Sequence, residues 1–240
     1  MKRILIAALT MVALCAALAW ASAPKPLLTP DQALERLQRG NERFVTSKMI
    51  HPNQDAFRRT TTAKEGQKPF ATILGCADSR VPLELVFDAG VGDLFVIRVA
   101  GNVTYFDAAG TIEYGAEHLG SNLLVVLGHT KCGAVNAVVD GAKVGGNLPA
   151  LVANIVPPVT EVKAANPGLA GVDLSNKAIE ANMWASIADL FKQSPVMREM
   201  VKSGKVKVVG AMYDIESGKV AFKGEHPKQA ELLALTSGPK

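Results

Sequence analysis

The chain predicts an α/β fold: a mostly parallel central β-sheet flanked by helices, with an N-terminal helical arm and a C-terminal hairpin at the sheet edge. Two observations support this fold class. Short continuous apolar runs alternate with segments of helical periodicity, and strands that are apolar on both faces are typical of parallel sheets covered on each side. The length of 240 residues and the hydrophobic content of 48% suffice for one sizeable core. Since no internal repeat is evident, we expect a single domain over residues 29–240.

Residues 1–21 have the pattern of a secretory signal peptide. Two basic residues precede an apolar stretch over residues 4–18, and A-x-A cleavage motifs end at Ala21 and Ala23. We therefore expect a periplasmic or secreted protein without stable membrane association after cleavage, and cleavage after Ala21 is preferred. The alternative is an uncleaved membrane anchor, since the apolar stretch is nearly long enough to span a bilayer.

The remaining elements follow from periodicity and turn signals. Residues 22–28 are expected to be a linker, and residues 29–48 an amphipathic helix with Thr29 as N-cap and Pro30 in its first turn. The apolar side of this helix must cover either its own sheet or a partner subunit. Residues 49–68 are polar and aperiodic. Strands are predicted at 69–75, 93–99, 122–127, 205–215 and 219–222. Further helices are predicted near 83–87, 108–119, 147–166, 173–192 and 195–203, with one more ending near 140, and the stretch over 147–166 is interrupted by Pro157 and Pro158.

Two short motifs rich in metal-ligand residues each follow a predicted apolar strand. The segment CADSR begins with Cys76, and the segment HTKCG begins with His129 and contains Cys132. In a parallel sheet both motifs reach the same carboxyl edge, where open α/β sheets bind their ligands. Two cysteines and one histidine are ligands that Zn²⁺ prefers, and three protein ligands leave one position open for chemistry. The sequence therefore predicts a catalytic zinc site with one ion per chain.

A disulfide is the rival explanation for the cysteines. Cys15 lies in the predicted signal peptide, so Cys76 and Cys132 are the two cysteines of the mature chain, and an oxidising compartment favours their pairing. The neighbouring Asp78 and Arg80 favour the metal, because their spacing allows a bidentate ion pair that could aim a carboxylate at a metal-bound water. A non-catalytic exported α/β protein with a structural zinc or a Cys76–Cys132 disulfide stays open as the alternative.

Together, the segments CADSRV, DLFVIRVAGN, GTIEYGAEHLG and VVLGHTKCGAV resemble the β-class carbonic anhydrases, and ALERLQRGNERF resembles the N-terminal helix of that family. The resemblance implies a carbonate dehydratase, a lyase that reversibly hydrates CO₂ to bicarbonate and a proton by attack of a zinc-bound hydroxide on CO₂. It matches Cys76, His129 and Cys132 with the zinc ligands. It matches Asp78 and Arg80 with the catalytic pair.

The resemblance also implies a set of substrate-binding residues: Gln67, Phe95, Ala100 and Gly133. Gln67 matches the glutamine that hydrogen-bonds the substrate in the plant-like subgroup, whose sites stay open, and this match favours that subgroup. The alternative in the family is a site that closes when the aspartate matching Asp78 leaves the arginine and binds the zinc. Ser194 falls where the same subgroup often carries a tyrosine at the pocket rim.

Members of the family form dimers with active sites at the interface, so a homodimer or a higher even-numbered homo-oligomer is expected. The net charge of +4, without a basic stripe, gives no support for nucleic-acid binding. The alternative enzyme is a hydrolase of carbonyl sulfide or carbon disulfide on the same fold, because such hydrolases share the zinc motifs.

Overall fold

The computed structural model describes residues 28–236. The predicted signal peptide, residues 1–21, lies outside the described residues, as does the predicted linker up to residue 27. None of the helices described is both long enough and apolar enough to cross a membrane.

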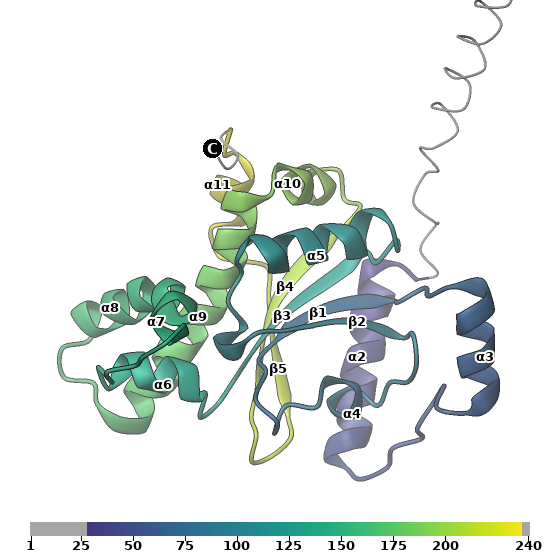
Figure 1. Cartoon of the computed structure of the whole chain (residues 1–240), viewed down its shortest axis with the longest axis horizontal. Helices are drawn as coiled ribbons and strands as arrows, with labels where there is room; N and C mark the ends of the chain where they lie inside the picture. Colours follow the sequence, from purple (N-terminus) through teal and green to yellow (C-terminus); the bar gives the residue numbers. More distant parts are fainter. Residues whose placement is uncertain (1–27, 237–240) are drawn as a thin grey trace, which may run out of the picture.

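A five-stranded sheet in the order β2-β1-β3-β4-β5 forms the centre of the molecule (Figure 1). Its strands are β1 (Ala71–Gly75), β2 (Leu94–Arg98), β3 (Leu123–His129), β4 (Lys207–Tyr213) and β5 (Val220–Gly224). All neighbouring pairs are parallel except β4 and β5, which form the predicted C-terminal hairpin. Gly75 pairs with Arg98, and His129 pairs with Tyr213, so the strand ends that carry the two motifs lie at one edge. The predicted α/β fold is confirmed, with small shifts at the strand ends.

Helices α2 (Pro30–Val45) and α4 (Leu83–Val86) cover one face of the sheet. Helix α2 begins at the predicted cap: the Thr29 hydroxyl accepts the Gln32 backbone N–H at 3.2 Å, and the Gln32 side chain accepts the Thr29 N–H at 2.8 Å. Leu37 of α2 is fully buried against strand residues, and such burial stabilises the contact by about 1.5–3 kcal/mol. The helix expected as an arm over residues 29–48 therefore packs on its own sheet, because its apolar side is occupied there.

Helices α5 (Phe106–Glu117), α9 (Gly171–Gln193) and α10 (Pro195–Lys202) cover the opposite face, and the short α11 (Gln229–Leu233) packs beside α9 and α10. Helix α9 approaches the sheet closely at Gly210 of β4. A Cβ atom at this position would lie 2.4 Å from the Met183 sulfur and 2.8 Å from the Trp184 ring, so any larger residue would force these side chains of α9 to move. Helix α9 is consequently a firmly seated platform behind the sheet.

A further group of short helices surrounds the ends of the two motifs. In chain order these are η1 (Ala100–Asn102), α6 (Gly133–Val139), α7 (Leu148–Val152), η2 (Ala153–Ile155) and α8 (Val156–Ala165). The helical stretch over 147–166 is thus divided, as its two prolines predicted, because Pro157 can lie in the first turn of α8 but cannot continue a preceding helix. Buried apolar side chains from this group, such as Ile155, form a cluster with Cys76 and Cys132.

Helix α3 (Ala56–Glu65) lies where the sequence indicated only a polar, aperiodic segment. The Asp55 side chain caps it by accepting the Arg58 backbone N–H at 2.6 Å. None of its residues is buried, and Phe57 is 80% exposed. Without an apolar stripe the helix has no periodic signal in the sequence. Figure 1 shows it at the margin of the molecule, apart from the sheet.

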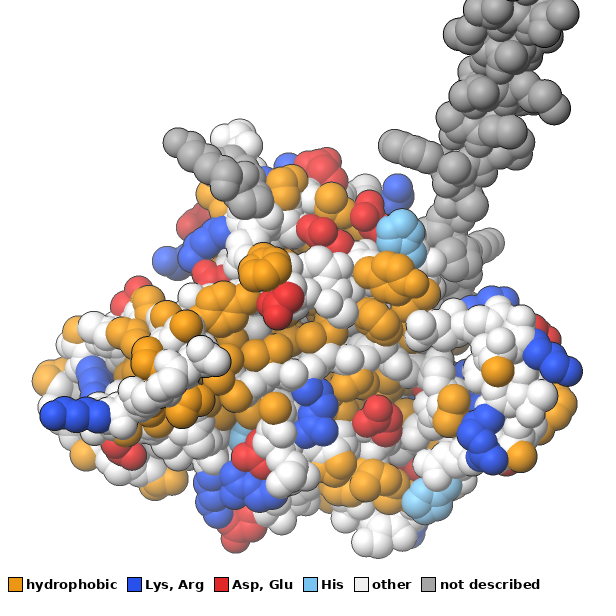
Figure 2. Space-filling view, in the orientation of Figure 1, with side chains coloured by type: hydrophobic (Ala, Val, Ile, Leu, Met, Phe, Trp, Pro, Cys, Tyr) orange, Lys and Arg blue, Asp and Glu red, His pale blue; other side chains and the backbone are white. Residues whose placement is uncertain are grey.

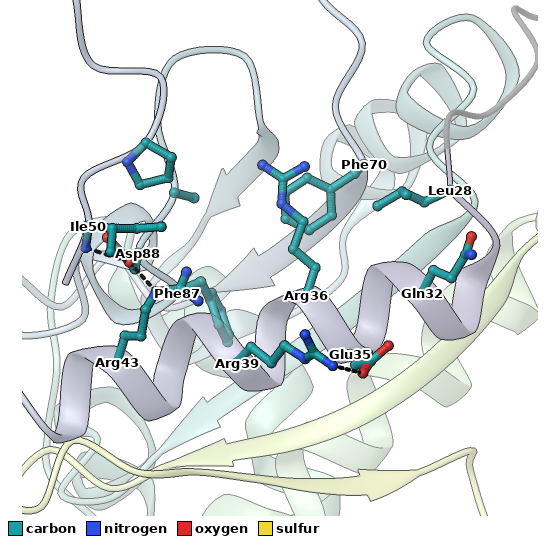
Figure 3. Close-up of a pocket in the computed structure, with 12 residues that line it drawn as sticks. Leu28, Gln32, Glu35, Arg36, Arg39, Arg43, Ile50, Phe70, Phe87 and Asp88 are labelled. Atoms are coloured by element: carbon teal, nitrogen blue, oxygen red, sulfur yellow. Dashed lines mark hydrogen bonds and ion pairs between the residues drawn. The ribbon is translucent and has the colours of Figure 1, made fainter. Parts of the chain in front are cut away.

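A groove of about 430 Å³ runs along α2 (Figure 3). Each of its arginines has a carboxylate partner: Arg36 meets Asp93 at 3.2 Å, Arg39 meets Glu35 at 2.6 Å and Arg43 meets Asp88 at 2.6 Å. Arg36 also lies over the Phe70 ring, 4.1 Å from its centroid. Arg36 and Arg43 therefore fasten α2 to its surroundings, whereas the Arg39–Glu35 pair lies within the helix, and the three pairs leave little free positive charge in the groove.

Candidate metal centre

Cys76, His129 and Cys132 meet at the carboxyl edge of the sheet. Cys76 directly follows β1, His129 is the last residue of β3, and Cys132 directly precedes α6. Their ligand atoms all lie within 4.8 Å of one another, and all three residues are buried. Both cysteines are free thiols in this arrangement. One metal ion could contact all three side chains, which is the donor set that the sequence predicted.

The imidazole of His129 is oriented for a metal. Its Nδ1 lies 2.9 Å from the Thr130 carbonyl oxygen, so Nδ1 carries the proton and donates to that oxygen. Its Nε2 is buried and has no hydrogen-bond partner within residues 28–236. Leaving such an atom unsatisfied costs about 1–3 kcal/mol. A metal ion would satisfy it, and a histidine ligand held through its other nitrogen is the usual arrangement in metal sites.

The two thiols differ in their ease of ionisation. The pKa of Cys76 is lowered to about 4, chiefly because its sulfur accepts a hydrogen bond from the Cys132 thiol. The pKa of Cys132 is raised, because its proton is engaged by Cys76 and its surroundings are apolar. The Gly101 backbone N–H also donates to the Cys76 sulfur, at 3.3 Å. The pair is therefore poised with one proton between two sulfurs, and a bound cation would favour the loss of that proton.

Asp78 and Arg80 form the predicted ion pair beside this cluster. The Arg80 Nε and Nη2 atoms donate to the two Asp78 carboxylate oxygens at 3.0 and 2.7 Å, and the Arg80 backbone N–H adds a bond of 2.9 Å. The hydrogen bond from the Arg80 side chain is the main cause that lowers the pKa of Asp78 to about 2. Arg80 also donates to the Lys131 carbonyl at 3.2 Å, which ties the two motifs together. Asp78 is thus an ionised acceptor with a fixed direction.

Arg98 at the end of β2 is a site residue that the sequence did not reveal. Its Nε donates to the Cys76 carbonyl at 3.0 Å, and its Nη2 donates to the Asp78 carbonyl at 2.6 Å. Arg98 therefore clamps the loop that carries the first ligand and the carboxylate. The contact depends on the register between β1 and β2, and the sequence pattern indicates the strands without their register.

Of the predicted substrate-binding residues, two lie beside the cysteine cluster and two do not. Ala100 begins η1 next to Gly101, and Gly133 begins α6 directly after Cys132. Phe95 pairs in register with Thr72, four residues before Cys76 along β1, which is roughly 13 Å at the rise of a strand. One chain thus does not bring Phe95 to its own cluster.

Gln67 lies at the other end of β1, in a groove of about 610 Å³ between α3 and α5. Tyr114 of α5 lines the same groove, and its ring centroid is 6.0 Å from that of Phe95 and 5.3 Å from that of His118. Gln67 and Tyr114 line this groove, and Phe95 joins them through its contact with the Tyr114 ring; we call this second cluster the aromatic groove. Tyr114 was not singled out from the sequence, because a half-exposed tyrosine on a helix has no distinguishing pattern.

Ser194 does not lie at a pocket rim. It is fully buried as the N-cap of α10, where its hydroxyl accepts the Met197 backbone N–H at 3.0 Å and donates to the Glu113 carboxylate. The serine that stands where the plant-like subgroup often carries a tyrosine therefore has a local structural role, as the cap of the helix that begins at Pro195.

The family model described as carbonic anhydrase matches residues 71–220 of this chain. Carbonic anhydrase 2 of Mycobacterium tuberculosis is 38% identical over 202 residues, which cover 82% of this chain and 95% of that protein. Among solved structures, the β-carbonic anhydrase CcaA has a TM-score of 0.63 at 25% identity and covers 81% of this chain and 98% of its own. The β-carbonic anhydrase CafA of Aspergillus fumigatus has a TM-score of 0.60 at 26% identity and covers 74% and 89%. With this extent of similarity around the Cys-His-Cys cluster, the chain belongs to the β-class carbonic anhydrase family.

Proposed function

We propose that this protein catalyses the zinc-dependent, reversible hydration of CO₂ to bicarbonate and a proton. One observation carries the proposal: Cys76, His129 and Cys132 converge within 4.8 Å beside a carboxylate that Arg80 holds in place. This arrangement supplies three protein ligands with an adjacent acceptor, which is what a catalytic zinc site requires. A purely structural site would need a fourth protein ligand.

The ligand residues and the Asp78–Arg80 pair have different roles in the proposed reaction. Cys76, His129 and Cys132 would hold the zinc, which when bound lowers the pKa of water toward neutrality and so makes a nucleophile available at working pH. Asp78 accepts a hydrogen bond from the reacting water and orients it. Arg80 keeps the Asp78 carboxylate ionised and fixes its orientation by donating to both of its oxygens. An Asp78 engaged by Arg80 is the arrangement expected of the plant-like subgroup with open sites, to which we assign the chain.

We also propose that two copies of the chain complete each other's sites, in a dimer or a higher even-numbered oligomer. The aromatic groove with Gln67 and Phe95 is separated from the ligand cluster of its own chain by most of the length of β1. Helix α3, which borders this groove, buries none of its residues within the chain. Figure 2 shows hydrophobic side chains across the face between α3 and the group of α6, α7 and α8. A second copy on this face would bring Gln67 and Phe95 to the partner's metal.

We further propose that residues 1–21 direct export and are removed, so that the enzyme acts in the periplasm or outside the cell. The basic, apolar and small-residue pattern of this segment supports the proposal. N-terminal sequencing of protein from a periplasmic fraction tests it, with Ser22 or Pro24 as the expected first residue. A mature protein that still begins at Met1 in the membrane fraction would contradict cleavage.

The proposed reaction is tested by stopped-flow CO₂ hydration with the zinc-loaded protein, together with metal analysis and thiol titration. We expect one zinc per chain, rapid hydration, and no disulfide in the metal-loaded protein. Hydration at the background rate combined with rapid sulfide release from carbonyl sulfide would overturn the assignment of CO₂ as substrate. A Cys76–Cys132 disulfide without zinc would overturn the metal centre.

A further inference from the structure

Asn182 of α9 is a buried polar residue that the proposed chemistry does not use. Its side chain is 1% exposed, and its Nδ2 donates to the Gly101 carbonyl at 2.7 Å. The Oδ1 of the same amide has no partner among the residues that the structure describes. A buried amide that is only half satisfied destabilises the fold relative to an apolar side chain. Within residues 28–236 the side chain of Asn182 thus has a single hydrogen bond, to Gly101 of η1, and this contact indicates the role of the residue.

Gly101 links Asn182 to the metal centre. The same residue that offers its carbonyl to Asn182 donates its N–H to the Cys76 sulfur at 3.3 Å. Gly101 has a φ of +74°, and a Cβ atom there would lie 2.7 Å from the Ile155 side chain, so only glycine fits. Glycine has wide rotational freedom, and its N–H keeps one direction only if the residue is held elsewhere. Asn182 provides that hold from the rigid platform of α9.

The orientation of the Asn182 amide is fixed by its partner. Turning the amide over would place Oδ1 against the Gly101 carbonyl, and two acceptors cannot form a hydrogen bond. The chain from Asn182 Nδ2 through Gly101 to the Cys76 sulfur therefore has a single direction of donation. A hydrogen bond to a thiolate ligand withdraws electron density from the sulfur, and residues that orient metal ligands in this way tune the metal.

We propose that Asn182 is a positioning residue for the metal centre, which holds Gly101 so that its N–H is directed at the Cys76 sulfur. The inference rests on the proposed zinc site but not on the identity of the substrate. Removing the amide frees Gly101 to rotate, weakens the N–H···S bond and leaves Cys76 a stronger electron donor.

The test uses Asn182→Leu, which keeps the approximate size of the side chain, and Asn182→Ala, which is the milder change within a helix. Ser186→Ala is the matched control, because Ser186 is also buried on α9, and its hydroxyl donates to the Asn182 backbone carbonyl at 3.0 Å rather than to Gly101. The readouts are the thiolate-to-cobalt charge-transfer absorption of the Co²⁺-substituted protein and the rate of zinc loss to a chelator. Neither readout requires CO₂ hydration.

We expect both Asn182 variants to shift the charge-transfer band to lower energy, because the Cys76 sulfur keeps more electron density. We also expect them to lose zinc about tenfold faster, because the Gly101 N–H no longer holds Cys76 in position, while Ser186→Ala matches the wild type in both measurements. The proposal is overturned if the Asn182 variants keep the wild-type band and zinc retention, or if Ser186→Ala changes them equally. A wild-type protein that takes up neither cobalt nor zinc would overturn the metal centre itself, and this inference with it. A wild-type protein that shows the thiolate-to-cobalt band but does not hydrate CO₂ would instead contradict only the proposed reaction.

Discussion

The ligand edge of the sheet and the aromatic groove contain two halves of one predicted site, and they are built differently. At the ligand edge, Cys76, His129 and Cys132 are buried and held by contacts within the chain. In the aromatic groove, Gln67 is exposed, and the neighbouring α3 buries nothing. The first region is complete in one chain, whereas the second has surface left over for a partner. Metal binding and substrate binding should therefore respond differently to mutation and to assembly.

The largest effect is expected from removing a ligand. His129→Ala should bind zinc at well under one ion per chain and reduce CO₂ hydration to background, because two thiols alone leave the metal site incomplete. Metal analysis and stopped-flow assays measure the two effects. Lys131→Ala is the control, since this exposed side chain lies in the same motif and, in the described part of the chain, pairs with Glu216 at the surface. Retention of stoichiometric zinc in the histidine variant would remove His129 from the ligand set.

The next largest effect is expected at Asp78. Asp78→Asn should keep its zinc but lose activity by roughly a hundredfold or more, because a neutral amide in this position can present a donor to the water instead of an acceptor. The measurement is kcat at matched zinc content. Full activity in this variant would exclude Asp78 from the mechanism.

A smaller effect is expected from Gln67→Ala, and it separates the two regions most sharply. This variant should retain zinc and lose roughly tenfold in kcat/KM. When it is co-expressed with His129→Ala, mixed dimers should contain one site with both an intact ligand set and a partner's Gln67. Activity per bound zinc should then rise above that of the Gln67→Ala protein alone. If Gln67 serves its own chain, mixing produces no such gain.

The smallest effect concerns stability rather than chemistry. Burial alone would raise the pKa of Asp88, but hydrogen bonds from the Ile50 N–H and the Arg43 guanidinium outweigh burial, so the pKa is lowered. A lowered carboxyl pKa contributes stability above its unfolded value of about 4, and this contribution is lost as the pH falls through the folded value. Asp88→Asn should therefore lower the free energy of unfolding by about 1–3 kcal/mol at pH 7.

Urea unfolding at a fixed protein concentration checks this prediction for Asp88. The difference between variant and wild type should shrink below pH 4. Asp214→Asn is the comparison, because the pKa of Asp214 is also lowered, chiefly by the Ser217 hydroxyl, but in an exposed turn. A difference for Asp88→Asn that is constant with pH would show that its charge does not contribute.

The sequence suffices for those features whose signals are local. Continuous apolar runs predict the strands, and the ligands directly follow two of these runs, so their meeting at one edge follows from parallel pairing. Features that depend on packing across the chain have no such signal. Predicting the hydrogen bonds of Arg98 requires the register between β1 and β2. Predicting the hydrogen bond from Asn182 to Gly101 requires the position of α9 on the sheet. Helix α3 is not predicted from the sequence because it has no buried apolar stripe and so no helical periodicity of apolar residues.

The burial of the three ligands also determines when the metal can enter. Because the three ligands are at most 4% exposed, an ion in solvent has little direct access to them, and we expect metal exchange to require local opening of the segments that carry them. The folded chain is therefore slow both to lose zinc and to gain it, and the ion is best acquired while the polypeptide is still folding. For a chain that crosses a membrane unfolded, loading would fall to the compartment of arrival, in competition with whatever oxidises its two thiols.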